Sequence, residues 1–577
     1  MDVLDAARRW LADDPDPVTR EELASVLAAA EAGDGPATVD LTDRFAARLE
    51  FGTAGLRGAM GAGPNRMNRV VVRRTAAGLA VWLRCTGGEQ AVQRGVVVGF
   101  DARHHSLEFA RDTASVLAGA GVTVHLMPGP LPTPILAFSL RQLGCAAGVM
   151  VTASHNPAAD NGYKVYDASG SQIVGPADRE ISDAIDAVGS VRELPLATLD
   201  DERVRRLGPE VVERYLSAVV GLVDAAAAAG RTPPLVSVYT PMHGVGGAVA
   251  LRAFARAGLP APHVVTEQAD PDPDFPTLSF PNPEEPGALD RALGLARTVG
   301  ADVVLANDPD ADRLGVAVPD PAVAGGWRLL SGDEIGVLLA SRVIDRIPPS
   351  QRGATAVATT IVSSTMLSEL AAAEGVGYVE TLTGFKWIAR ATDGDDRRLA
   401  FGYEEALGSC VAPSLVRDKD GISAMLVFAD LVASLKVDGR TVPDALDDLA
   451  RRFGVHATSQ WSLRLAGLDG VAQREAVMAR LRGDPPAELA GRPVVRFADL
   501  LAPGGPLPPS DVVVLHLDGA RVVIRPSGTE PKLKSYFEVV VPVVDDLAGA
   551  RELADAELLV LRQAVADLVG TPGGPTG

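Results

Sequence analysis

The sequence predicts an α/β protein in which three α/β domains precede a C-terminal α+β domain with antiparallel strands. The chain has 577 residues, too many for a single hydrophobic core at roughly 100–200 residues per domain. Short β-branched runs alternate with Ala- and Leu-rich helical stretches, a pattern typical of mostly parallel sheets with mixed edges. After about residue 455 this alternation gives way to successive strand patterns.

The elements follow in order. Residues 1–45 are acidic and Ala-rich, with apolar residues at helical spacing, and predict a helical arm. The runs GVVVGFD, SLEFARDTASVLAGAG and VTVHLM (95–127) predict a first βαβ unit. The rhythm restarts at PLVSVYT (234–240) and again at TAVATTIV (355–362), so three similar units are expected.

The C-terminal part begins with strand patterns and ends in a helix. DVVVLHLDGARVVIR (511–525) predicts a hairpin that turns at Asp-Gly, and 544–569 predicts a helical tail. The domain boundaries expected from these patterns are an arm over 1–45 and domains over 46–225, 226–335, 336–455 and 456–577.

Composition excludes several classes of function. With 54 Lys and Arg against 74 Asp and Glu, the formal charge of −20 argues against nucleic acid as a partner. The three cysteines show no CxxC spacing, so neither disulfides nor zinc are expected. No run approaches a membrane span, and the acidic N-terminus lacks the features of a signal peptide. We therefore expect a cytoplasmic protein without a membrane partner.

Lysine is rare in this chain. Only six of the 54 basic residues are lysines, so a lysine is expected where a compact ammonium group is needed. Lys436 is the exception, and its place near a probable helix end favours a C-terminal cap. The other five fall in the motifs below: Lys164, Lys386, Lys419, Lys532 and Lys534.

The loop VTASHNPAADNGYKVY follows an apolar strand and presents Ser154 with His155 beside it. Small residues and a proline shape such a loop, and it does not match the GxSxG elbow of hydrolases. An ordinary serine turn is an equally good interpretation of these residues alone.

Three carboxylates alternate in VVLANDPDADRLGVAV, directly after a buried strand. Asp308, Asp310 and Asp312 would converge beyond the strand end, and oxygen ligands of this charge select a hard cation such as Mg²⁺. An EF-hand is excluded because Arg313 and Pro319 stand where its Gly and Glu are required. The alternative is an Asp-rich turn that caps a helix. Arg313 is a candidate to orient a carboxylate or to bind a phosphate.

Further loops offer groups for a polar ligand. RPSGTEPKLK combines a guanidinium, hydroxyls and two ammonium groups, which predicts a phosphate site. ETLTGFKWI and FGYEEALGS supply hydroxyl, amine and carboxylate groups. LVRDKDG places Lys419 between two aspartates, where the alternative interpretation is a surface ion pair. In LEFGTAGLRGAMGAG, glycines surround Arg57 and allow the backbone to approach an anion closely. The candidate residues in the first three of these loops are Thr383, Gly384, Lys386, Glu404, Arg525, Ser527, Gly528, Thr529, Lys532 and Lys534.

In this order, TASHNP, DPDADR, YEEALG and RPSGTEPK resemble the motifs of the α-D-phosphohexomutase family over about residues 45–540. The resemblance implies four domains around a cleft and a phosphoryl group carried on Ser154. It also implies Mg²⁺ held by Asp308, Asp310, Asp312 and the serine oxygen.

The other roles are likewise implied by the resemblance. Arg57 and Lys164 would assist proton transfer near Ser154, Lys419 would match a catalytic lysine, and His155 would belong to the catalytic loop. Glu404 would accept from sugar hydroxyls, and the loop from Arg525 to Thr529 would hold the distal phosphate. The expected partner is a phosphosugar, with a sugar bisphosphate such as glucose 1,6-bisphosphate as activator, in a monomer or small homo-oligomer.

The expected reaction moves a phosphoryl group between C1 and C6 of a hexose, with glucose preferred to mannose. Ala406 stands where the family's hexose loop usually has a serine, and the YEEALG form is similar to a branch that also contains phosphopentomutases and glucose-1,6-bisphosphate synthases. A phosphopentomutase or such a synthase is the alternative. Two other classes remain open: a phosphatase that forms a phosphoserine, and a sugar-phosphate sensor without catalysis.

Overall fold

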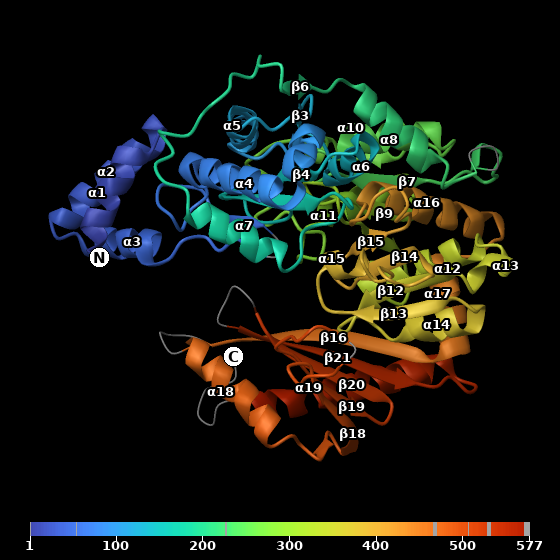
Figure 1. Cartoon of the computed structure of the whole chain (residues 1–577). Coiled ribbons are helices and arrows are strands. Elements are labelled where there is room, and N and C mark those ends of the chain that lie inside the picture. The colour runs from blue at the N-terminus through green and yellow to red at the C-terminus, as the bar shows by residue number, and fades with distance from the viewer. Residues whose placement is uncertain are drawn as a thin grey trace. The chain divides into compact units, whose positions relative to one another are not determined.

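The computed structural model describes residues 2–52, 55–224, 228–465, 470–505, 507–527 and 532–570. The chain divides into two compact units (Figure 1). Unit 1 comprises residues 1–330 and 408–437, and unit 2 comprises residues 331–407 and 438–577. Each unit is therefore built from two separate stretches of sequence.

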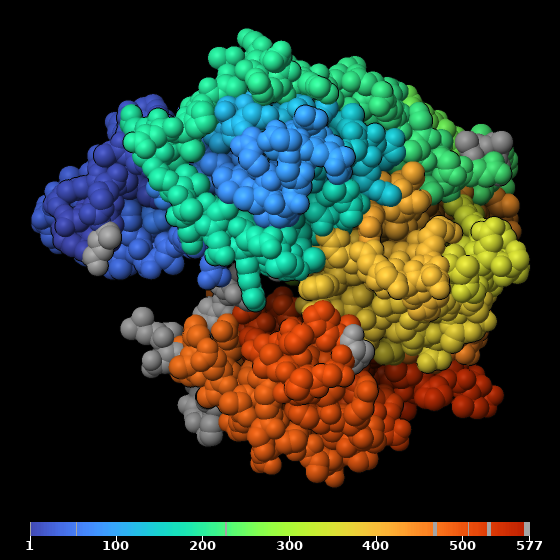
Figure 2. Space-filling view, viewed as in Figure 1, coloured from blue at the N-terminus to red at the C-terminus, as the bar shows by residue number. Residues whose placement is uncertain are grey.

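Three short helices form the N-terminal arm of unit 1: α1 (Val3–Asp13), α2 (Pro17–Glu31) and α3 (Gly35–Ala46). Each begins after an aspartate whose carboxylate accepts from a backbone N–H of the first turn, which stabilises the helix start. The arm forms a lobe at the side of unit 1 (Figure 2), and its small core includes Trp10, Leu23 and Leu41.

The first sheet of unit 1 has the order β1-β5-β4-β2-β3-β6. Strands β4, β2, β3 and β6 are parallel, and β5 and β1 are added antiparallel at one edge. Its strands are β1 (Leu56–Ala59), β2 (Val96–Phe100), β3 (Val124–Leu126), β4 (Ala147–Val151), β5 (Asp160–Asp167) and β6 (Val204–Arg206). Its helices are α4 (Arg69–Arg94), α5 (Ser106–Gly119), α6 (Thr133–Leu143), α7 (Ala177–Asp186) and α8 (Glu210–Val220).

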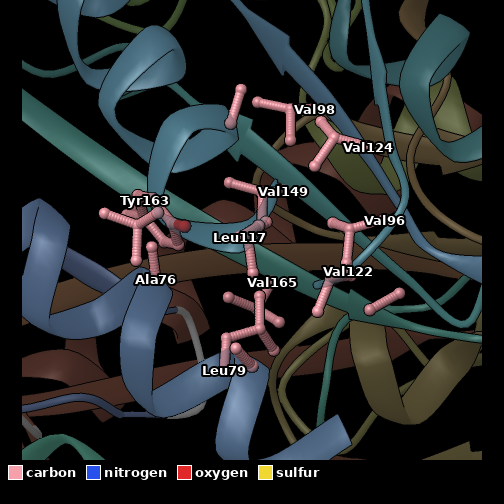
Figure 3. Packing of buried hydrophobic residues seen from close by; sticks show 14 of the residues in the cluster. Ala76, Leu79, Val96, Val98, Leu117, Val122, Val124, Val149, Tyr163 and Val165 are labelled. Atoms are coloured by element: carbon pink, nitrogen blue, oxygen red, sulfur yellow. The ribbon is translucent and has the colours of Figure 1, made fainter. Parts of the chain in front are cut away.

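The core of this domain is aliphatic. Val96, Val98 and Val149 on the parallel strands pack with Leu79 of α4 and Leu117 of α5 (Figure 3). Because the central strands are buried on both faces, they appear in the sequence as continuous apolar runs.

The second sheet of unit 1 has the order β11-β10-β9-β7-β8, parallel at one end and antiparallel at the other. Its strands are β7 (Ser237–Thr240), β8 (His263–Val264), β9 (Val303–Ala306), β10 (Gly315–Pro319) and β11 (Trp327–Leu329). Its helical segments are α10 (Gly247–Arg256), η1 (Thr266–Gln268) and α11 (Asp290–Val299).

Unit 1 is completed by β15 (Gly408–Cys410) and the almost fully buried helix α16 (Gly421–Val437). Helix α16 packs against α8, α10 and β9. The Lys436 ammonium group lies in its last turn but donates to Asp302 Oδ2 at 2.7 Å and to the Pro234 carbonyl at 2.9 Å. Lys436 therefore anchors the helix to the second sheet, a contact that the cap interpretation did not include.

Unit 2 contains the third α/β domain, in which β12 pairs in parallel with both β13 and β14. Its strands are β12 (Thr355–Thr360), β13 (Gly377–Thr381) and β14 (Arg398–Glu404). Its helices are α12 (Gly332–Asp345), α13 (Pro349–Arg352), α14 (Met366–Glu374), α15 (Phe385–Ile388) and α17 (Val442–Phe453).

The C-terminal domain of unit 2 has an antiparallel sheet in the order β16-β21-β20-β19-β18-β17. The predicted Asp-Gly turn joins β19 to β20, and Gly519 adopts φ +64° there. Its elements are β16 (Val455–Arg464), α18 (Gly470–Gly483), β17 (Glu488–Leu489), β18 (Arg492–Asp499), β19 (Val513–Leu517), β20 (Ala520–Pro526), β21 (Lys532–Val541) and α19 (Leu547–Val569).

This architecture confirms the predicted fold class, with three α/β domains before an antiparallel α+β domain. In the described ranges, no helix is both long enough and apolar enough to cross a membrane. The three cysteines are free thiols, as their spacing predicts.

Candidate functional site

Ser154 lies in the loop between β4 and β5, at the end of a central strand of the first sheet. Its φ of +52° is rare for a residue with a side chain, and its backbone N–H donates to Thr152 Oγ1 at 2.8 Å. The side chain is buried, at 2% exposure. The loop therefore holds one serine in a strained conformation, which points to a function rather than an ordinary turn.

Arg103 holds this loop from behind. Its Nη2 donates to the carbonyl oxygens of Ser154 at 2.7 Å and Asn156 at 2.5 Å, and its Nη1 donates to that of Pro157 at 2.8 Å. Asp101 accepts from the Arg103 backbone N–H at 3.0 Å. Our sequence analysis missed Arg103, although an Asp-x-Arg directly after β2 was the available signal.

Asp308, Asp310 and Asp312 follow β9, the central strand of the second sheet. All three are fully buried, and one carboxylate oxygen from each lies within 4.8 Å of the others. The chain then continues into strand β10, so the interpretation of these acids as a helix cap is wrong. Convergence of the three carboxylates, expected from the alternating sequence, is confirmed.

The serine loop and the aspartate loop meet. Ser154 Oγ donates to Asp308 Oδ2 at 2.9 Å, and Thr133 Oγ1 donates to Asp310 Oδ2 at 2.6 Å. Thr133 begins helix α6 of the first domain, so two elements of that domain bind the aspartate loop. Thr133 is a second residue that sequence reasoning missed, since nothing in its local pattern distinguishes it.

Two lysines neutralise part of the negative charge. Lys164 of β5 places Nζ 2.7 Å from Asp310 Oδ2 and 3.0 Å from Asp312 Oδ2, while Lys419 Nζ lies 3.2 Å from Asp312 Oδ2. Both lysines are buried. Lys419 is therefore not part of a surface ion pair, the alternative that its sequence context had left open.

The triad suits a divalent metal ion. Asp310 Oδ1 and Asp312 Oδ1 are buried, and neither has a hydrogen-bond partner within the described part of the chain. Buried carboxylate oxygens rarely stay unpaired, because their desolvation is costly. A hard cation coordinated by these oxygens would satisfy both, and an all-oxygen ligand set favours such an ion.

The pKa values of Asp308 and Asp312 are shifted in opposite directions. Burial and the negative charges of Asp312 and Asp310 raise the pKa of Asp308 well above its usual range. Burial also opposes ionisation of Asp312, but Lys164, Lys419 and Arg313 outweigh it and hold the pKa of Asp312 below its usual range. Asp308, the carboxyl group that faces Ser154, therefore takes up a proton more readily than Asp312, which stays ionised.

His155 stays neutral beside the serine. Its Nδ1 lies 3.2 Å from Ser154 Oγ, and burial followed by the charges of Arg313 and Arg57 lowers its pKa well below the usual value. A neutral imidazole at this distance is able to exchange a proton with the serine oxygen or to orient it.

Arg57 and Arg313 border the same site. Arg57 lies on β1, and its Nη1 donates to Asn156 Oδ1 at 3.1 Å in the serine loop. The Arg313 backbone N–H donates to Asp308 Oδ1 at 3.0 Å, and its guanidinium Nε lies 4.0 Å from Asp312 Oδ1. Both guanidinium groups therefore stand next to the residues that the motifs single out.

Two glycines near Arg57, Gly55 and Gly63, allow neighbouring chain segments to pack closely. Gly55 has φ +76°, and a Cβ there would lie 1.8 Å from the Tyr163 carbonyl oxygen. Gly63 has φ +112°, and a Cβ there would lie 3.0 Å from Arg44 Cβ of the arm. Close approach to neighbouring chain segments explains these glycines without a bound anion.

In unit 2 the structure brings together Thr383 and Arg525. Arg525 Nη1 donates to Thr383 Oγ1 at 2.7 Å. Gly384 follows with φ +108°, and buried Lys386 places Nζ 5.5 Å from the centre of the Trp387 ring. The two predicted loops of this unit therefore adjoin each other.

The remaining candidates of unit 2 surround the same strands. The Ser527 N–H donates to the Lys532 carbonyl at 2.8 Å, and Lys534 pairs with Arg525 between β20 and β21. Glu404 ends β14 and is half-buried. The other predicted residues of the phosphate loop, Gly528 and Thr529, lie outside the described residues.

Glu405 differs from Glu404. Its Oε2 accepts from Thr360 Oγ1 and Ser363 Oγ, both at 3.1 Å, and burial raises its pKa. Its hydrogen bonds stay within unit 2, so Glu405 shapes the loop and leaves Glu404 as the candidate for ligand contact.

Comparison with known proteins assigns the domains to a family. Four family models match in order, described as phosphoglucomutase/phosphomannomutase alpha/beta/alpha domain I (48–192), domain II (213–324), domain III (331–453) and C-terminal domain (468–556). A phosphoglucomutase/phosphomannomutase family protein from Burkholderia thailandensis has the same fold in its crystal structure. Its TM-score is 0.66 at 20% identity, with 90% of this chain and 97% of that chain covered.

Three relatives extend over most of the chain. A probable phosphomannomutase of Haemophilus influenzae is 45% identical over 478 residues, which are 82% of this chain and 93% of the relative. A phosphoglucomutase of Staphylococcus aureus is 34% identical over 528 residues, 88% of this chain and 93% of the relative. A phosphopentomutase of Mus musculus is 34% identical over an alignment of 602 positions, which covers 94% of this chain and 93% of the relative. The chain therefore belongs to the phosphoglucomutase/phosphomannomutase family, as its motifs predicted, and is a phosphosugar mutase.

Proposed function

We propose that this mutase interconverts glucose 1-phosphate and glucose 6-phosphate by way of a phosphoryl group carried on Ser154. The observation that carries the proposal is the 2.9 Å hydrogen bond from Ser154 Oγ to Asp308, within a buried triad of acids flanked by two lysines. A phosphatase or a sensor would not need this chain's full set of serine, acids and cations, and none of them is missing.

In the proposed cycle, a sugar hydroxyl attacks the phosphorus of phosphorylated Ser154. A bond forms from the sugar oxygen to phosphorus, the bond from phosphorus to Ser154 Oγ breaks, and the proton of the sugar hydroxyl passes, in net terms, to Ser154 Oγ. In the return step, Ser154 Oγ attacks the other phosphate of the bisphosphate, the bond from that phosphorus to its sugar oxygen breaks, and the proton passes back to the sugar oxygen, which leaves an isomeric monophosphate. Such transfer depends mainly on positioning and on neutralising charge at the phosphoryl oxygens.

We infer that residues around Ser154 provide both the positioning and the positive charge that this transfer requires. Arg103 and the strained backbone fix Ser154, so its oxygen does not have to be oriented during the reaction. Lys164 and Lys419 place positive charge at the acids, and burial of Lys164 is outweighed by Asp310 and Asp312, which raise its pKa. Lys164 is thus held protonated, as a fixed positive charge beside the acids.

We assign Mg²⁺ to Asp308, Asp310 and Asp312, because the unpaired buried Oδ1 atoms of Asp310 and Asp312 fit a hard cation. When bound, the ion would neutralise phosphoryl oxygens during transfer. We assign the activator role to glucose 1,6-bisphosphate, because a bisphosphate restores the phosphoserine when an intermediate escapes.

Unit 2 is proposed to bind the rest of the substrate. Arg525, held by Thr383, together with the loop at Ser527, has the donors that a phosphate group prefers. Glu404 and Lys386 are proposed to bind sugar hydroxyls. Roles at Gly528 and Thr529 remain predictions from the motif.

The competing candidate is a pentose-phosphate mutase. Ala406 offers no side-chain hydrogen bond where the family's hexose loop usually has a serine, and the phosphopentomutase of Mus musculus is similar over nearly the whole chain. A missing hydrogen bond weakens discrimination by about 1–3 kcal/mol, which broadens specificity without reversing it.

Kinetics with glucose, mannose and ribose 1-phosphates test the proposal. We expect the highest kcat/KM with glucose 1-phosphate, and a shift toward hexose by about 5- to 150-fold in Ala406→Ser, which corresponds to about 1–3 kcal/mol. A kcat/KM for ribose 1-phosphate that clearly exceeds that for glucose 1-phosphate would replace the hexose proposal by the pentose one.

A further inference from the structure

Two adjoining hollows lie where the N-terminal arm meets the first domain of unit 1, and their lining includes residues of helices α1, α4 and α7. Figure 1 labels these three helices. One has a volume of about 150 Å³ and the other about 350 Å³. Trp10, Pro64 and Arg74 line both of them. Neither hollow contains any residue assigned above to the phosphoryl-transfer site.

The smaller hollow is mainly apolar. Its walls include Leu49, Phe51 and Leu56 from the entry to β1, and Val71 and Ile185 from α4 and α7. A cavity of about 150 Å³ with such walls is large enough for a benzene-sized group. It therefore fits an aromatic ring or a branched aliphatic chain.

Unsatisfied donors stand at the wall that the hollows share. Trp10 Nε1 and Arg74 Nε are both buried, and neither has a hydrogen-bond partner among the residues that the structure describes. Arg74 Cζ lies 6.0 Å from the centre of the Trp10 ring. Buried N–H groups are almost always paired, so two orphan donors on neighbouring side chains point to an absent acceptor.

The charge of the lining favours an anion. The lining holds three arginines, Arg9, Arg48 and Arg74, and two aspartates, Asp13 and Asp186, of which Asp186 pairs with Arg48. The arginines therefore exceed the aspartates by one. Asp13 already accepts from the hydroxyl of Ser190 through Oδ1, and its Oδ2 lies 3.4 Å from Arg74 Nη2. A carboxylate on the ligand would offer the acceptor oxygens that the Trp10 and Arg74 donors lack, and arginine binds carboxylates well.

We propose that these hollows form an effector site for a small organic carboxylate with an apolar body of about phenyl size. The apolar body occupies the smaller hollow, and the carboxylate accepts from Trp10 Nε1 and the Arg74 guanidinium. Since side chains alternate along a strand, Leu56 of β1 faces this hollow while its neighbour Arg57 reaches Asn156 in the serine loop. Occupancy of the hollow therefore acts on the strand that carries Arg57.

The binding test uses the full-length protein with 3-phenylpropionate as the probe. Calorimetric titration or ligand-detected NMR measures the binding. Excess inorganic phosphate is present throughout, so that phosphate sites elsewhere do not bind the probe. We expect a Kd of about 1 mM or lower, and at least about tenfold weaker binding of the uncharged 3-phenylpropanol.

Three variants locate the binding. Arg74→Gln removes the guanidinium, and Ser182→Leu fills the smaller hollow without touching a charge, so each should weaken binding at least about tenfold. Arg84→Gln, an exposed position on the same helix, should leave it unchanged. No binding to the wild type, or affinity unchanged in both Arg74→Gln and Ser182→Leu, would overturn the site.

The effector role has its own readout. Saturating 3-phenylpropionate should change kcat or KM of the mutase reaction at least about twofold in the wild type and in Arg84→Gln, but not in Ser182→Leu. Equal kinetic constants with and without saturating probe in the wild type would overturn the effector role.

Discussion

Ser154 Oγ lies 2.9 Å from Asp308 Oδ2, although the two residues are 154 positions apart in the chain. Each stands in the loop that follows a central strand of its own sheet, β4 or β9. The proposed phosphoryl carrier and the proposed metal-site carboxylate are thus held by two different sheets. A change at either position is expected to affect turnover more than folding.

Ser154→Ala should reduce mutase turnover at least about 10³-fold, because the phosphoryl carrier is removed. The loop retains its Arg103 contacts, so stability should change by no more than about 1.5 kcal/mol. Steady-state kinetics and thermal unfolding measure both effects, with Ser217→Ala at an exposed position of α8 as the control. In intact-mass spectra, the purified wild type should carry about 80 Da for one phosphoryl group and the variant none. A phosphate that maps to another residue would contradict the assignment.

Removal of divalent metal should abolish turnover while the protein stays folded. Added Mg²⁺ should restore activity, Mn²⁺ should restore part of it, and Ca²⁺ should restore little, because its larger radius and looser geometry misplace the phosphoryl oxygens. Asp310→Asn should resemble the metal-free enzyme, with a loss of at least about 10²-fold, whereas Asp290→Asn on the surface should not. Rates measured with chelator and after metal addition provide the check. Full turnover in chelator is incompatible with the proposed metal site.

Arg103→Lys should lower both stability and kcat. A single ammonium group cannot serve the carbonyls of Ser154, Asn156 and Pro157 together, and the acceptors left buried should cost about 2–4 kcal/mol. Because Arg103 positions the loop without a predicted substrate contact, KM should change less than kcat. Denaturant unfolding and steady-state kinetics test this, with Arg84→Lys as the control. A kcat equal to that of the wild type would show that the loop does not depend on Arg103.

Asp333→Asn should stabilise the protein at neutral pH. Burial, followed by the nearby Glu538 charge, raises the pKa of Asp333 to about 6 from a usual 3.8, so the ionised form is unfavourable in the folded state above pH 6. Ionisation of Asp333 therefore lowers the free energy of unfolding at pH 7–8. This destabilisation disappears as the pH falls through 6 toward 4, because the folded protein then binds the extra proton. The expected gain at pH 7.5 is about 1–3 kcal/mol.

The local hydrogen bonds permit this exchange. Asp333 Oδ1 accepts from Ser364 N–H and Tyr403 OH, and Oδ2 accepts from Thr458 Oγ1, whose hydroxyl is able to turn and accept from an amide instead. Unfolding temperatures of wild type and Asp333→Asn across pH 4.5–8 should converge at the acidic end. Exposed Asp396→Asn provides the comparison. A difference that does not vary with pH would exclude ionisation of Asp333 as its cause.

Much of the fold followed from sequence because its signals are local. Continuous apolar runs predicted β2 and β4, and the Asp-Gly pair predicted the turn at Gly519, since each depends on neighbouring residues alone. The alternating aspartates likewise predicted their own convergence. These patterns required no knowledge of the tertiary arrangement.

The contacts that complete the site could not be predicted from local patterns. Lys419 reaches Asp312 across more than 100 positions, and Thr133 reaches Asp310 across 177. The Asp-x-Arg after β2 marks Arg103 locally, but its contacts with the loop of Ser154 depend on the pairing of β2 with β4. The distinct roles of Glu404 and Glu405 are likewise set by distant residues, because Glu405 accepts hydrogen bonds from Thr360 and Ser363.

The composition of unit 1 has a consequence for the order of events during synthesis. Helix α16 belongs to unit 1, packs against α8 and α10, and buries Asp430 against Arg231 at 2.7 Å. The ribosome nevertheless makes this helix only after residues 331–407, which belong to unit 2. A nascent chain that ends at residue 330 exposes the apolar surfaces meant for α16 and has three buried aspartates without Lys419. Unit 1 is thus expected to wait, incompletely packed, until residue 437 leaves the exit tunnel, and chaperones that bind exposed apolar surface have their main opportunity in that interval.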